Sequence, residues 1–248
     1  MISFTGIMRS TNHAVREFGA LWLDYLYPPV CRSCAGLLTR GEHQVCATCW
    51  ANIPRISSDH LLFQDTNEKL LSSRCIHGLV SVFVFEKESA FQHIVHALKY
   101  DGVRSLGVAL GKQIGLALLD ARITADYVLA VPLHRRKYRE RGYNQSDSLA
   151  EGITSITGIV QLRTLICRSK DTQSQTTLNL EQRKKNVHEA FSLKSNRVNS
   201  VEGKSFIIVD DVITTGATIE ACAKILLACG AQKIIAASAA LAQKDTNI

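Results

Sequence analysis

Two adjacent carboxylates and a threonine-rich turn form the segment of this chain with the clearest chemical potential. Asp210 and Asp211 directly follow the apolar run 206–209, and a helical pattern begins after Thr218. Backbone N–H groups of a glycine-containing turn at a helix N-terminus bind phosphate, and threonine hydroxyls add further donors. Paired acids suit a ligand that also carries a ribose, and they can help to hold Mg²⁺ on its oxygens. The predicted binding residues are Asp210, Asp211, Thr214, Thr215, Gly216, Ala217 and Thr218, with the catalytic role assigned to the two aspartates.

A run of basic residues after the apolar segment 127–131 is the second group that could do chemistry. Its cations are opposed by a single acid, Glu140. Positive charge here would stabilise a phosphorylated ligand, so we predict a ligand-binding loop that includes Arg135 and Arg136, and a mobile lid over 135–145. The phosphoribosyltransferase resemblance described below implies that this loop binds pyrophosphate. A solvated surface loop fits the sequence equally well. The residues predicted for the lid or for contact with DNA are Lys137, Arg139, Arg141, Tyr143, Asn144 and Gln145.

Four of the eight cysteines lie in two close pairs. Cys31 and Cys34 form the first pair, and Cys46 and Cys49 form the second after an interval of eleven residues. Two such pairs can supply four thiolates to a tetrahedral Zn²⁺, and a segment this poor in apolar residues needs a metal to fold. A closed site of four cysteines has no open position for a substrate, so we predict structural zinc.

The hydrophobic pattern indicates which elements position these groups. Near-continuous apolar strands alternate with helices from residue 79 onward, which predicts an α/β fold with an open, mostly parallel sheet and helices on both faces. Ligands bind such sheets at the carboxyl ends of strands, so the position of Asp210–Thr218 favours a ligand site over an ordinary capped turn with solvated acids. The predicted organisation is an amphipathic helix over 1–27, a Cys₄ zinc module over 28–55, a linker over 56–78 and the main domain over 79–248.

Composition restricts the class of protein and its partners. Apolar residues make up 46% and charged residues 21% of the chain, which is ordinary for a globular protein. The net charge of +7 favours polyanionic partners such as nucleic acid or phosphorylated ligands. No stretch of about 18 uncharged apolar residues and no secretory signal pattern are present, so we expect a cytoplasmic protein without membrane insertion.

The segment Asp210–Thr218 resembles the signature of type I phosphoribosyltransferases, and the whole chain resembles the ComF family of ComFC-like and GntX-like proteins. The short motifs that match in order are Leu98-Lys99-Tyr100, Val131-Pro132, Arg141-Gly142-Tyr143-Asn144-Gln145, Gln175, Arg183, Asn186, Ala190-Phe191 and Asp210–Thr218. The resemblance implies a phosphoribosyltransferase-like domain that binds phosphoribosyl pyrophosphate with Mg²⁺. It adds Lys99 to the ligand-binding residues and places Arg183 and Asn186 near the site, as residues of the lid or of a contact with DNA. Their spacing of three residues on a helix is equally compatible with a surface role. The resemblance also implies binding of single-stranded DNA, alongside other competence proteins, in natural transformation.

Three functions remain open at the level of sequence. The first is a binding module for phosphoribosyl pyrophosphate and single-stranded DNA. The second is an active phosphoribosyltransferase, although no residue identifies the base or amine that would accept the sugar. The third is a nucleotide-sensing regulator, which the fold alone does not distinguish from the others. Family members often carry a second cysteine set before the main domain, whereas here only Cys75 lies there.

Overall fold

The computed structural model describes residues 28–168, 191–193 and 201–243. The helix predicted near the N-terminus, together with Arg183 and Asn186, lies outside these residues. The chain divides into two compact units, Met1–Asn52 and Ile53–Ile248, which are considered separately. Among the described helices, none combines the length and hydrophobicity that crossing a lipid bilayer demands.

The second unit is built on a five-stranded sheet in the order β1-β7-β6-β2-β3. All four strand pairings are parallel, which confirms the predicted fold class. The strands are β1 (Leu79–Phe85), β2 (Tyr127–Ala130), β3 (Val160–Gln161), β6 (Ser205–Ile213) and β7 (Lys233–Ala242). A separate antiparallel pair, β4 (Ile166–Arg168) and β5 (Phe191–Leu193), has strands too short to show a sequence period.

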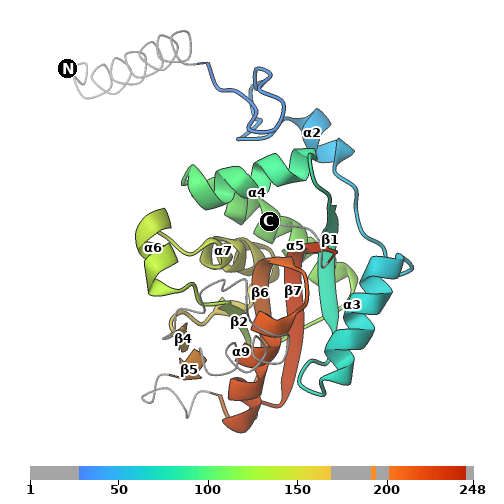
Figure 1. The fold of residues 1–248 in the computed structure, drawn as a ribbon, viewed down its shortest axis with the longest axis vertical. Helices are drawn as coiled ribbons and strands as arrows, with labels where there is room; N and C mark the ends of the chain where they lie inside the picture. The colour runs from blue at the N-terminus through green and yellow to red at the C-terminus, as the bar shows by residue number, and fades with distance from the viewer. Residues whose placement is uncertain (1–27, 169–190, 194–200, 244–248) are drawn as a thin grey trace, which may run out of the picture. The chain divides into compact units, whose positions relative to one another are not determined.

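Helices cover both faces of the parallel sheet (Figure 1). Helices α5 (Arg104–Asp120) and α7 (Gln145–Thr157) pack together on one face, beside α4 (Ala90–Tyr100). Their axes approach closely because Gly111 has no side chain: a Cβ there would overlap the carbonyl oxygen of Leu149. Helix α9 (Ala217–Ala228) covers the other face, where Cys222 and Leu226 join the same core cluster as Phe206 of β6.

Two segments without predicted regular structure are helical. Helix α3 (Leu61–Ser72) occupies much of the segment 56–78, which we predicted to be a linker. Only Thr66 and Leu70 are buried on it, so its apolar pattern is too weak to predict a helix. Helix α6 (Arg135–Arg141) replaces the expected basic loop. It has no apolar stripe, but the His134 side chain caps its first turn and Gly142, at φ 76°, ends it.

Candidate functional site

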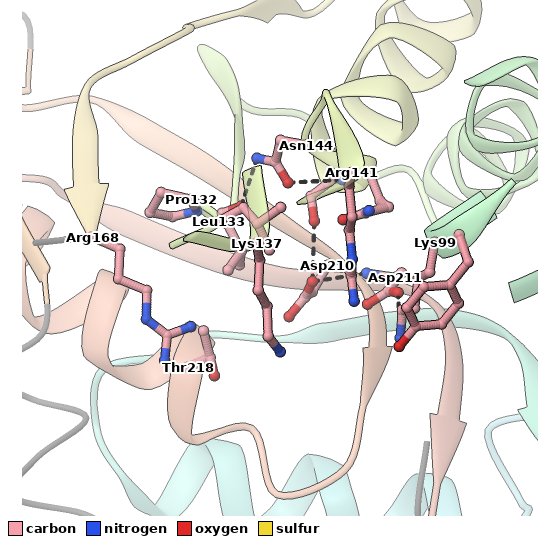
Figure 2. A pocket seen from close by; sticks show the side chains of 14 residues that line it. Lys99, Pro132, Leu133, Lys137, Arg141, Asn144, Arg168, Asp210, Asp211 and Thr218 are labelled. Carbon is pink, nitrogen blue, oxygen red and sulfur yellow. Dashed lines mark hydrogen bonds and ion pairs between the residues drawn. The ribbon is translucent and has the colours of Figure 1, made fainter. Parts of the chain in front are cut away.

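A cavity of about 180 Å³ opens where β2 and β6 end (Figure 2). This is the sheet edge at which an open parallel sheet binds ligands. Eight residues predicted for the site line the cavity, namely Lys99, Lys137, Arg141, Asn144, Gln145, Asp210, Asp211 and Thr218. Segments far apart in the sequence thus converge on one small volume.

The two aspartates have different partners. The Ser146 hydroxyl donates a hydrogen bond to Asp210 Oδ1 over 3.1 Å, and the backbone N–H of Asp211 donates to the same oxygen. Lys99 Nζ forms an ion pair with Asp211 Oδ2 at 2.8 Å, and both side chains are largely covered. One carboxylate is therefore neutralised by a cation, whereas the other accepts neutral donors.

This asymmetry sets the protonation of the pair. Burial, and next the negative charge of Asp211, raise the pKa of Asp210 to about 7. Burial also opposes ionisation of Asp211, but the Lys99 charge and hydrogen bond outweigh it and hold the pKa of Asp211 below its ordinary value. Near neutral pH Asp211 therefore carries a full negative charge, whereas Asp210 is divided between its protonated and its ionised form.

Helix α6 presents two cations to the cavity. Lys137 and Arg141 are four residues apart and so share one face of the helix. The Arg141 guanidinium carbon lies 5.2 Å from the centroid of the Tyr100 ring, a cation–π contact that fixes its position. Arg136 does not line the cavity; its Nε donates to Glu140 Oε1 over 3.0 Å on an exposed face.

The other basic residues of helix α6 lie on faces of the helix that do not line the cavity. Arg135 and Arg136, expected to hold pyrophosphate, are exposed and do not line the cavity, and neither does Arg139. A loop could direct successive side chains to one ligand, whereas a helix directs only every third or fourth residue. The structure thus brings Lys137 and Arg141, and not Arg135 and Arg136, to the cavity.

The residues that follow α6, in the segment predicted to be a mobile lid, are hydrogen-bonded to neighbouring elements. Tyr143 is buried, and its hydroxyl donates to the carbonyl of Leu98, the residue before Lys99. Asn144 Nδ2 donates to the carbonyl of Val131 at 2.9 Å, while its Oδ1 accepts the N–H of Ser146 at the start of α7. These bonds tie the ends of α4 and β2 to α7, and burial of Tyr143 withdraws it from the surface on which DNA could stack.

The threonine turn leads into α9 as predicted from sequence. Gly216 precedes the first turn with φ 75°, a conformation that side chains rarely adopt. A Cβ at Gly216 would also overlap Leu70 Cδ2, so α3 packs directly beneath the turn. Only Thr218 of this segment lines the cavity, while Thr214, Thr215 and Ala217 are half-buried beside it.

Sequence reasoning missed several lining residues. Ser146 directly follows the Arg141–Gln145 motif, a position that could have identified it. Arg168 carries no such signal, because the pairing of β4 with β5 brings it to the cavity and its guanidinium carbon lies 5.3 Å from the Phe191 ring centroid. In Figure 2, Arg168 and Thr218 lie at the end of the cavity opposite Lys99. The other lining residues not assigned to the site are Tyr100, Val131, Pro132 and Leu133.

The four paired cysteines of the first unit come together around one point. Their sulfur atoms all lie within 4.8 Å of one another, with Cys49 on the short helix α2 (Ala47–Asn52). Burial opposes ionisation of the Cys31 thiol, but N–H groups, including those of Ser33 and Cys46, donate to its sulfur and lower its pKa to about 6. Four clustered thiols with such donors fit a structural Zn²⁺, which binds thiolates.

The fold and these two sites define a phosphoribosyltransferase-like protein with an N-terminal zinc-ribbon module. The family model for a phosphoribosyl transferase domain matches residues 159–247, and that for a double zinc ribbon domain matches residues 22–60. These two matches, together with the relatives below, are consistent with the ComF family that the sequence resembles.

Curated relatives carry names that refer to DNA utilization or to competence. The chain is 28% identical to DNA utilization protein YhgH of Escherichia coli O6:H1 over 218 residues, which cover 84% of this chain and 94% of that protein. Competence protein F of Haemophilus influenzae is 30% identical, covering 57% of this chain and 63% of its own length. Competence protein ComFC of Bacillus subtilis is 25% identical, with coverages of 80% and 78%.

Proposed function

We propose that the protein binds phosphoribosyl pyrophosphate together with Mg²⁺ in the cavity of Figure 2. The observation that carries this proposal is the charge arrangement of the lining. Four cations, Lys99, Lys137, Arg141 and Arg168, surround the two carboxylates of β6. An excess of positive charge around paired acids suits a ligand that is both highly phosphorylated and rich in hydroxyls.

Each part of the ligand has a matching group in the proposal. The carboxylates of Asp210 and Asp211 accept hydrogen bonds from the ribose hydroxyls, and the turn that ends at Thr218 holds the 5′-phosphate at the start of α9. Lys137 and Arg141 face the pyrophosphate. The oxygen donors of the two aspartates also fit Mg²⁺, which prefers carboxylate and phosphate oxygens and, when bound, would neutralise part of the ligand's charge.

Binding of single-stranded DNA is the second part of the proposal. The face of α6 turned away from the cavity exposes Arg135, Arg139 and Tyr138, whose side chains can contact phosphates and stack on a base. The basic net charge supports binding of a polyanion, and the names of the relatives support a role in natural transformation alongside other competence proteins. We propose that this role is carried out in the cytoplasm.

Calorimetric titration with phosphoribosyl pyrophosphate and Mg²⁺ tests the first part. We expect saturable binding by the wild type and a loss of at least about a hundredfold in affinity for the Asp210→Ala/Asp211→Ala variant, because ligand hydroxyls and Mg²⁺ lose their acceptors. Asp126→Ala is the matched control, since Asp126 lies outside the cavity and pairs with Lys204. No heat of binding to the wild type would contradict the proposal.

Filter binding of labelled single-stranded DNA across a salt series tests the second part. Affinity should fall steeply with salt, and Arg135→Gln/Arg139→Gln should weaken binding and flatten that dependence. Lys112→Gln/Lys233→Gln removes the same charge at two exposed sites outside the cavity and α6, and should lower affinity much less. An equal loss of DNA affinity in the two double variants would show that α6 is not the DNA-binding face. Failure of the wild type to bind at low salt would contradict DNA binding altogether.

An active phosphoribosyltransferase is the alternative, and one observation favours it. The pKa of Asp210, raised to about 7, makes its carboxylate able to take a proton from an attacking amine near neutral pH. In that reaction the bond from the sugar to pyrophosphate breaks, a bond to the acceptor nitrogen forms, and Asp210 receives the proton. Release of pyrophosphate with a panel of bases and amines, absent in Asp210→Asn, would support turnover. If no acceptor in the panel releases pyrophosphate, the protein is better described as a binding module.

A further inference from the structure

The roles proposed above leave the side-chain amide of Gln145 without a function. Gln145 is 3% exposed and lines the cavity. Its Nε2 is buried and has no hydrogen-bond partner among the described residues. Buried donors are nearly always satisfied in folded proteins, and an unsatisfied one is destabilising. An orphaned donor in the wall of a ligand cavity therefore indicates a contact that a ligand completes.

The residues on either side hold Gln145 in place. Asn144 is bonded to the carbonyl of Val131, the residue after β2, and Ser146 is bonded to Asp210. Gln145 begins α7 and thus lies between the segment that follows β2 and the carboxylates of β6. Because both neighbours are anchored, the backbone of Gln145 is fixed before a ligand arrives, and the amide is preorganised to donate.

We infer that Gln145 Nε2 donates a hydrogen bond to a pyrophosphate oxygen of the bound ligand, an inference that rests on the function proposed above. Asp210 and Asp211 are matched to the sugar hydroxyls, and the turn that ends at Thr218 is matched to the 5′-phosphate. The pyrophosphate is the remaining part rich in acceptor oxygens. Lys137 supplies charge to it, while the neutral amide of Gln145 selects a particular oxygen and orientation. Gln145 is thus a specificity-determining residue for pyrophosphate-bearing ligands.

Gln145→Met tests this inference because it keeps the length of the side chain and removes the donor. Titrations with phosphoribosyl pyrophosphate and with inorganic pyrophosphate, each with Mg²⁺, should show affinity reduced about tenfold. Affinity for ribose 5-phosphate should stay within about twofold of the wild type, since that ligand lacks the contacted group. The midpoint of thermal unfolding should stay the same or rise, because an unsatisfied buried donor is lost. Gln145→Glu, which replaces the donor with a negative charge, should weaken both pyrophosphate ligands further.

Ser148→Ala provides a matched control on the same helix. Ser148 Oγ is also buried without a partner in the described structure, but Ser148 does not line the cavity and packs against Gly107 of α5. Its removal should leave all three affinities unchanged. If the wild type binds phosphoribosyl pyrophosphate and Gln145→Met binds all three ligands as the wild type does, the inference fails while the proposed function stands. An equal loss for ribose 5-phosphate would also overturn it. If the wild type does not bind, the proposed function itself fails.

Discussion

The cysteine module and the α/β unit achieve order by different means. Within residues 28–52 the buried side chains are Cys31, Val45 and Cys49, so apolar burial contributes little there. The α/β unit instead encloses a continuous core, in which side chains such as Leu110 and Phe206 are fully buried. The comparison shows two relations between a ligand and a fold. A structural metal can be required for folding, or a ligand can bind to a fold that is stabilised by its own core. We expect the order of the module to depend on Zn²⁺, because it buries few apolar side chains. The elements that form the cavity of the second unit have an apolar core of their own.

Removal of zinc should have the largest effect on stability of all the changes proposed here. It should unfold the cysteine module and leave the α/β unit folded. We expect a strong chelator to unfold the module completely, because metal binding supplies its folding free energy. Hydrogen exchange should show loss of protection over 31–49 and unchanged protection in β6 and β7. Cys46→Ser should behave in the same way without a chelator. Amides of the module that stay protected without zinc would contradict a requirement for the metal. Simultaneous unfolding of both units would contradict their independent stability.

Gly216→Ala should produce the next largest effect, confined to the second unit. The alanine must adopt a left-handed backbone conformation, and its Cβ would overlap the Leu70 side chain. We therefore expect a loss of about 2–4 kcal/mol in the free energy of unfolding. Leu70→Ala alone should also destabilise by opening a cavity. Urea unfolding should show that the double variant loses less than the sum of the single losses, because the overlap is relieved. Strict additivity would show that α3 does not support the turn.

The pH dependence of stability should reveal the state of Asp210. Its pKa is about 7 in the folded chain and about 4 when unfolded, so between these values only the folded state holds the proton. The contribution of Asp210 to the free energy of unfolding is therefore largest at low pH and is lost as the pH rises toward 7. Relative to the wild type, Asp210→Asn should gain about 1–2 kcal/mol between pH 5.5 and pH 8. Asp211, whose pKa is lowered, titrates below this window. A difference between variant and wild type that does not change with pH would contradict the assignment.

A surface ion pair on α6 should produce the smallest effect. Arg136 and Glu140 are bonded at 3.0 Å but are more than half exposed, so solvent screens their attraction. Glu140→Gln should change the free energy of unfolding by less than about 0.5 kcal/mol and leave ligand affinity unchanged. A large loss of ligand affinity would show that α6 is held in place by this pair.

The sequence predicted the parts of the site that follow directly from strand ends and motif order. Asp210 and Asp211 were identifiable because an apolar strand leads straight into them, and the cysteine pairs because their spacing fits zinc. Helix α6 was missed because its signals are a cap and a left-handed glycine, not a hydrophobic period. Arg168 was missed because only the pairing of two three-residue strands brings it to the cavity, and such pairing depends on tertiary contacts that spacing does not encode.

Crystals of the protein soaked with phosphoribosyl pyrophosphate and Mg²⁺ test the central claim most directly. Our account predicts electron density in the cavity, with the sugar hydroxyls on Asp210 and Asp211 and the 5′-phosphate at the turn before α9. Density that leaves these aspartates without a ligand, in a crystal that has bound the compound elsewhere or not at all, would contradict the account.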